Sequence, residues 1–225
     1  MKGEDDPAQL RELLEKRGFR LVYQIKRPRG IPAIDFYSPG STDSGVMGYV
    51  SLERKTRRDA YGVGFGAACV IAGELLQPAS ARFKSNAEFP NHVFDPPHVM
   101  LFNAGRLLGL PLTNIPDPVD PRTPEQLRND FIAQVLEPCV EGPKNCMDVL
   151  DILRRHDPPF EWFLPIRSAL YFAATARAVG FTRGQAASEL MAMNTRLPGE
   201  WSDSERWGNL TNIIISTLWS EAARH

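Results

Sequence analysis

Long apolar runs are absent from this chain of 225 residues, and cysteine and histidine are scarce. The apolar stretch 67–72 is among its longest, and it falls far short of the about 20 residues that a membrane-spanning helix needs. We therefore expect no membrane partner. The first six residues are acidic and lack an apolar core, so they do not resemble a secretory signal. A cytoplasmic location is the prediction.

The three cysteines form no recognisable metal or disulfide pattern. An odd count is typical of a reducing compartment. Cys139 and Cys146 have six residues between them, which is not the spacing of a zinc-binding pair. We expect ordinary thiols.

Charge of one sign is not in excess. The 26 basic and 27 acidic residues leave a net charge of −1, which provides no general attraction to nucleic acid or to an anionic membrane. An apolar content of 43% and a charged content of 24% are those of a folded chain with a sizeable core.

The first third predicts a helix followed by an antiparallel sheet. Leu10, Leu13 and Leu14 share one face of a helix over 6–17, Gly18 ends that helix, and Phe19 can fold back onto its apolar side. Alternating apolar residues and tight turns then predict strands, followed by a helix that ends before Pro78. The strands are expected at 19–26, 33–37, 46–52 and 61–65, and the helix at 67–76.

The second half has helical periodicity. Thr123 to Gln126 is a typical helix start, and Leu127, Phe131 and Val135 follow on one face. Further helices are expected at 97–108, 145–155, 164–179, 183–194 and 204–223. Alternate prolines make 115–121 an extended connector. The prediction is an α+β fold, with an α+β module over 1–115 and a mainly helical module over 122–225. The alternative is that the two modules pack as one domain.

Three segments invite a chemical interpretation. His92, Asp95 and His98 could bind a divalent metal in a small hydrolase or nuclease, although a proline-rich loop with solvent-facing histidines is the competing interpretation. Residues 62–67 match a dinucleotide-binding glycine pattern, but charged residues precede them where a buried strand is needed, so no cofactor is predicted. The region 183–197 is similar to part of a helix-turn-helix and would serve a DNA-binding regulator.

Basic residues cluster in two places. Lys26, Arg27 and Arg29 form one group, and a second group surrounds the end of the third strand. The second group consists of Arg54, Lys55, Arg57 and Arg58. If the strands pair as hairpins, both groups lie at one edge of the sheet and could contact phosphate or an acidic protein partner. A solvated edge that resists aggregation is the alternative interpretation.

The pattern Leu10-x-x-Leu13-Leu14-x-x-x-Gly18-Phe19, followed by strands, resembles the start of bacterial α+β immunity proteins, which neutralise secreted toxins. The resemblance covers about the first third of the chain. It implies a non-enzymatic protein that inhibits a toxin partner by steric and electrostatic blockade, with neither catalytic residues nor a cofactor. The expected partner-binding residues are Arg27, Arg29, Arg54, Arg57 and Arg58.

Overall fold

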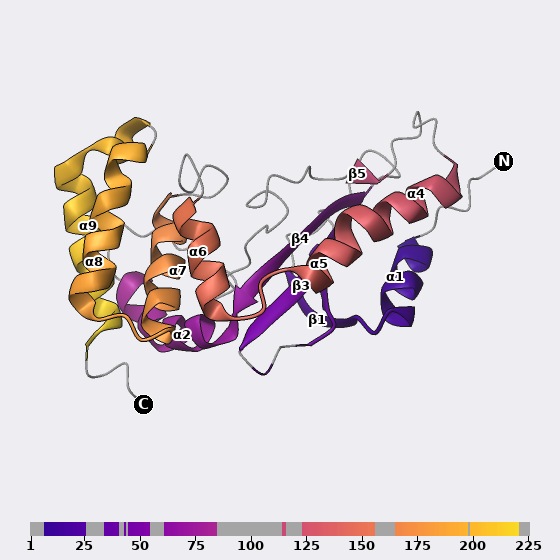
Figure 1. Cartoon of the computed structure of the whole chain (residues 1–225), viewed down its shortest axis with the longest axis horizontal. Coiled ribbons are helices and arrows are strands. Elements are labelled where there is room, and N and C mark those ends of the chain that lie inside the picture. The colour runs from indigo at the N-terminus through magenta and orange to yellow at the C-terminus, as the bar shows by residue number, and fades with distance from the viewer. Residues whose placement is uncertain are drawn as a thin grey trace. The chain divides into compact units, whose positions relative to one another are not determined.

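The computed structural model describes residues 7–25, 34–40, 43, 45–54, 61–84, 114–115, 123–155, 165–197 and 199–220. It has the predicted α+β architecture of an N-terminal helix, a small antiparallel sheet and a mainly helical remainder (Figure 1). In this part of the chain no helix has both the length and the apolar character that crossing a membrane requires.

Two compact units make up the chain. The sheet unit contains residues 1–68 and 101–144, and the helical unit contains 69–100 and 145–225. The units alternate along the sequence, whereas the predicted modules 1–115 and 122–225 divide it at a single connector. The predicted helix 97–108 and most of that connector lie outside the described residues.

Helix α1 (Pro7–Lys16) ends as its sequence predicts. Gly18 adopts a φ of +82°, which a residue without a Cβ tolerates. Its N–H donates to the carbonyl of Glu15 at 3.0 Å, and the N–H of Phe19 donates to the carbonyl of Leu14 at 2.9 Å. Phe19 is buried in the same cluster as Leu14. The turn therefore fixes where the first strand begins relative to the helix.

The five strands follow one another in the sheet in chain order. They are β1 (Arg20–Ile25), β2 (Ile34–Ser38), β3 (Val46–Arg54), β4 (Tyr61–Cys69) and β5 (Asn114–Ile115). β1 pairs antiparallel with β2, β2 with β3, and β4 with β5. The sequence located β1 to β4 but not β5, which has only two residues and no periodicity to detect.

Strand β1 departs from the simple alternation that the sequence predicts. Leu21 lies opposite Tyr37 and Tyr23 lies opposite Phe36, so Val22 has no residue opposite it. This is a β-bulge, which redirects the side chains around it. A simple alternation over 19–26 would place Leu21 on the buried side of the strand together with Phe19, but Leu21 is 52% exposed.

Helices cover one face of the sheet. α4 (Pro124–Phe131), the π-turn η2 (Ile132–Leu136) and α5 (Glu137–Glu141) form a continuous helical segment. Thr123 and Gln126 cap its start reciprocally, as predicted. The core between these helices, α1 and the sheet includes Leu14, Phe19, Tyr37, Val50, Phe131 and Leu136. A Cβ on Gly48 would lie 3.0 Å from the carbonyl oxygen of Cys139, so α5 can approach β3 only at a glycine.

A buried carboxylate ties α1 to the sheet. Asp35 is only 5% exposed. One of its oxygens accepts a hydrogen bond from Arg11 of α1 at 2.7 Å, and the other accepts from Gln24 of β1 at 2.6 Å. Because a buried carboxylate is costly without partners, this network favours a single arrangement of α1, β1 and β2.

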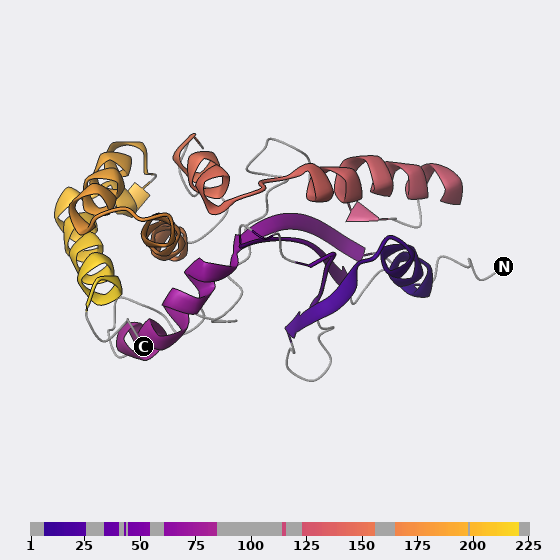
Figure 2. The ribbon, with the colours of Figure 1, turned by 60° about the horizontal axis from the view of Figure 1, so that its bottom comes forward.

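The helical unit is built around α7 (Pro165–Ala178), which packs against each of its major helices (Figure 2). Residues 169–174 of α7 are all buried. The other elements are α2 (Val70–Lys84), α6 (Cys146–Arg155), α8 (Arg183–Met193), η3 (Asn194–Arg196), η4 (Gly199–Ser202) and α9 (Ser204–Leu218). A second glycine–phenylalanine turn, Gly180-Phe181, ends α7 with the same hydrogen bonds as the turn after α1.

Helix α2 begins and ends later than the sequence predicts. Residues 67–69 belong to β4, and the helix continues past Pro78 to Lys84. The predicted end before Pro78 is therefore wrong. Proline lacks the N–H of an interior hydrogen bond, but Leu76, Ala79 and Phe83 are all buried and continue the apolar face. Packing against α7 and α9 thus compensates for the missing bond.

Cys69 and Cys146 form a disulfide, so the prediction of an ordinary thiol is wrong for Cys146. Cys69 ends β4 and Cys146 begins α6, at a sequence separation of 77 that no local spacing reveals. Each lies within two residues of a point where the chain enters the helical unit. Cys139 is the remaining thiol and is buried. The odd count therefore reflects one pair and one thiol, and no longer argues for a reducing compartment.

We predict that breaking this disulfide destabilises the helical unit. Closing a loop of this length restricts the unfolded chain and contributes about 4 kcal/mol to the free energy of unfolding. Urea unfolding of the oxidised protein should therefore lose about this amount when a reductant is present. The control is the double variant Cys69→Ala/Cys146→Ala, on which the reductant should have no effect. Identical unfolding curves for the parent protein in the two redox states would contradict the bond.

We also predict that Asp35→Asn lowers the free energy of unfolding by about 1–3 kcal/mol, because the buried Asp35 site then loses its charge opposite Arg11. Chemical denaturation measures the change. Glu12→Gln is the control, since it removes the exposed ion pair between Glu12 and Lys16 and should alter stability little. Equal stability of Asp35→Asn and the parent would show that the network does not hold α1 in place.

Candidate functional site

The pairing of the first three strands brings the attachment points of two basic segments to one end of the sheet. Ile25, the last residue of β1, pairs with Ile34, the first residue of β2, and Ile34 pairs in turn with Glu53 near the end of β3. Segment 26–33 joins β1 to β2, and segment 55–60 joins β3 to β4. Both segments are therefore attached at the same end of the sheet, which we call the basic end.

The two segments attached at the basic end are rich in basic residues, although the chain as a whole has almost no net charge. Residues 26–33 and 54–60 contain seven lysines and arginines and one aspartate, whereas the net charge of the chain is −1. A local concentration of this kind attracts an acidic surface and accelerates its association.

Of the expected partner-binding residues, the described part of the chain includes Arg54 alone. Arg54 is the last residue of β3, and its main chain lies at the basic end. Arg27, Arg29, Arg57 and Arg58 lie outside the described residues, as do His92, Asp95 and His98 of the metal hypothesis. Within the described ranges, no three His, Cys, Asp or Glu side chains come together as a metal site would require.

The glycine pattern of residues 62–67 lies inside β4. A dinucleotide site needs its glycines in the turn between a strand and a helix, where backbone N–H groups face the phosphates. Here the strand continues to Cys69 and α2 starts at the next residue. The glycines make this part of β4 narrow and do not form a phosphate-binding turn.

The region 183–197 contains α8 and η3, with Thr182 and Gln185 forming a capping box at its start. Arg183 is the sole basic residue of α8. Glu189 of that helix binds Arg154 of α6 through two hydrogen bonds, at 2.7 and 2.9 Å. Arg196 also faces this cluster and donates to the carbonyl oxygen of Arg154. These charges connect α6, α8 and η3, so the segment lacks the basic surface that a DNA-reading helix needs.

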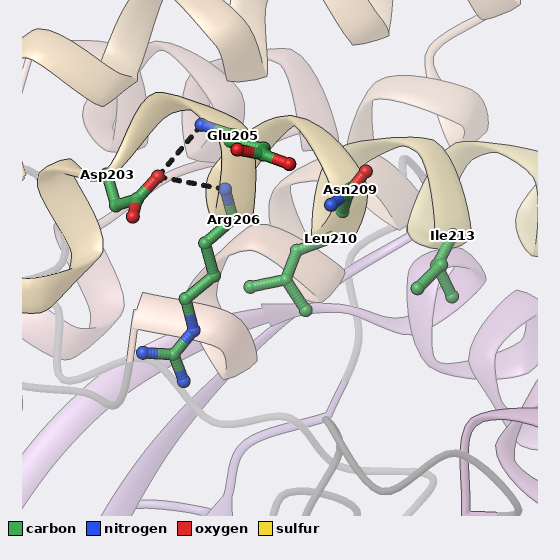
Figure 3. Close-up of a pocket in the computed structure, with 6 residues that line it drawn as sticks. All are labelled: Asp203, Glu205, Arg206, Asn209, Leu210 and Ile213. Atoms are coloured by element: carbon green, nitrogen blue, oxygen red, sulfur yellow. Dashed lines mark hydrogen bonds between the residues drawn. The ribbon is translucent and has the colours of Figure 1, made fainter.

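A hollow of mixed polar and apolar lining, which the sequence did not indicate, lies along α9 (Figure 3). Its volume of about 280 Å³ is just below the about 300 Å³ at which ligand sites begin. The lining residues are Asp203, Glu205, Arg206, Asn209, Leu210 and Ile213. Asp203 accepts hydrogen bonds from the N–H groups of Glu205 and Arg206 at 2.9 and 3.1 Å, and so caps the helix. The hollow follows from this helix start and is a weaker candidate than the basic end.

The thiol of Cys139 is not a candidate nucleophile. Burial raises its pKa to about 12, although the nearby Lys144 acts in the opposite direction. A thiol with this pKa is protonated at neutral pH, and the thiolate is the reactive form. Cys139 contributes to the core between α5 and β3.

No family model matches the chain, and comparisons with curated proteins and with solved structures find no match either.

Proposed function

We propose that this protein is a non-enzymatic binding protein of the immunity type, which inhibits a cognate bacterial toxin by covering it. The observation that carries the proposal is the pairing of Ile25 with Ile34 and of Ile34 with Glu53, because it attaches both basic segments to one end of the sheet. The basic end is the proposed contact surface, and Arg27, Arg29, Arg54, Arg57 and Arg58 are its partner-binding residues.

The mechanism follows from charge and shape. A group of arginines presents planar donors that suit carboxylates, and an acidic surface of the toxin supplies the complementary charge. Once seated there, the protein blocks the toxin sterically or holds it in an inactive shape. Neither route requires a reacting group or a cofactor on this chain. The resemblance of residues 10–19 to immunity proteins supports the same proposal, since the helix, the glycine and the folded-back phenylalanine are all present.

Charge reversal at the basic end is predicted to weaken binding of the partner. A tagged form of the protein, expressed in its host, captures the partner, which is then purified and titrated by calorimetry. The double variants Arg27→Glu/Arg29→Glu and Arg57→Glu/Arg58→Glu should each raise the Kd by about tenfold or more, because attraction becomes repulsion. The affinity of the parent should also fall as salt is added.

The matched control reverses two exposed arginines of the helical unit, Arg155→Glu/Arg183→Glu, and should leave the Kd unchanged. If all three double variants bind like the parent, the basic end is not the interface. If the captured partner is a nucleic acid, the immunity proposal fails.

A cytoplasmic location is also part of the proposal, and the disulfide provides its test. In a reducing cytoplasm Cys69 and Cys146 exist as two thiols, and the bond closes only on oxidation. Cells quenched in acid and alkylated at once should therefore yield both cysteines in the modified form by mass spectrometry. The control is lysate that is oxidised before alkylation, in which both should escape modification. A bond already closed in the quenched cells would place the protein in an oxidising compartment.

A further inference from the structure

Two adjacent apolar side chains are exposed on the outer strand of the sheet. β1 has one neighbour among the described strands, β2, so its other edge is unpaired there. Leu21 is 52% exposed and Val22 is 45% exposed. Exposed apolar residues that lie together and are framed by polar groups are typical of protein contact surfaces.

The bulge at Val22 lies within the exposed pair. In a regular strand, neighbouring residues point to opposite faces, and one of this pair would lie on the face that α1, α4 and α5 cover. Tyr37, which lies opposite Leu21, is buried on that face. The bulge interrupts this alternation, and both residues leave apolar surface in water.

Two exposed arginines lie just before the pair in the sequence. Arg17 and Arg20 are both exposed, and none of the hydrogen bonds or ion pairs seen in the described part of the chain involves their side chains. The neighbouring basic residues differ, since Arg11 binds Asp35 and Lys16 binds Glu12. The buried Phe19, between the two arginines, anchors the segment to α1.

We infer that Arg17, Arg20, Leu21 and Val22, here called the edge patch, bind a segment of a partner protein that combines apolar and acidic side chains. The inference rests on the proposed function and specifies the chemistry of the partner. Leu21 and Val22 supply the apolar contact, and the two arginines select carboxylates beside it. A bulge interrupts the row of backbone groups that an added strand would use. Recognition therefore proceeds through side chains.

The test is a selection of random displayed peptides on the intact protein, followed by fluorescence anisotropy with the selected peptides. The selected sequences should be apolar residues next to aspartate or glutamate. Leu21→Thr/Val22→Thr keeps residues that suit a strand while removing apolar surface, and should raise the Kd of these peptides by about tenfold. Arg17→Glu/Arg20→Glu should do the same.

The matched control is Val140→Thr, the same substitution at a valine of α5 that is 53% exposed. It should leave the peptide Kd unchanged, and equal melting temperatures would show that every variant is folded. The inference is overturned if no peptide is selected, if the selected peptides are not acidic, or if the edge-patch variants bind them like the parent. Dimerisation of the parent that the threonine pair abolishes, or binding of the parent to anionic phosphatidylserine vesicles, would also overturn it.

The same binding measurements distinguish failure of the edge-patch inference from failure of the proposed function. One outcome is that charge reversal at Arg27 and Arg29 weakens binding of the captured partner, while the threonine pair changes neither partner binding nor peptide binding. The basic end is then supported as an interface and the edge patch is not. The other outcome is that the threonine pair weakens peptide binding, while charge reversals at the basic end leave partner binding unchanged. The edge patch is then supported as an interface and the basic end is not.

Discussion

The antiparallel register of the first three strands is the constraint on which the proposed binding surface depends. Ile25, Ile34 and Glu53 lie side by side across three strands, so the segments that leave them leave from one end of the sheet. A shift of one residue in either pair would turn the apolar residues of a strand from the face that α1, α4 and α5 cover to the opposite face. The same packing that buries Tyr37 and Val50 therefore also brings these strand ends together.

Helix α1 keeps that register in place through two kinds of contact. Its apolar face and Phe19 bury apolar surface, and the hydrophobic interaction that results is not directional. The hydrogen bonds of Asp35 with Arg11 and Gln24 supply direction, because each carboxylate oxygen accepts from a different element. The turn at Gly18 connects α1 to β1, because it ends the helix and starts the strand within a few residues.

Both units contain the same kind of helix-ending turn, but the phenylalanine of the turn has different surroundings in each. Each contains a helix that ends in a glycine followed by a phenylalanine, with the same pair of backbone hydrogen bonds. After α1 the phenylalanine enters the core, whereas after α7 the ring of Phe181 lies 5.0 Å from the guanidinium carbon of Arg154. In the helical unit a disulfide and a central buried helix replace the sheet as the means of holding distant segments together.

The sequence alone determined what depends on neighbouring residues. The helix before Gly18, the strands β1 to β4, and the helices α4, α6, α7, α8 and α9 were predictable from periodicity, capping residues and turns. Both basic segments could also be found by inspection. Local pattern could not reveal the bulge at Val22 or the continuation of α2 through Pro78.

Only the tertiary structure decided which distant residues meet. The pairing of Cys69 with Cys146, the burial of Asp35 between Arg11 and Gln24, and the exposure of Leu21 all depend on elements far apart in the chain. The physical reason is that capping and periodicity act within a few residues, whereas burial and pairing are set by whichever elements pack against them.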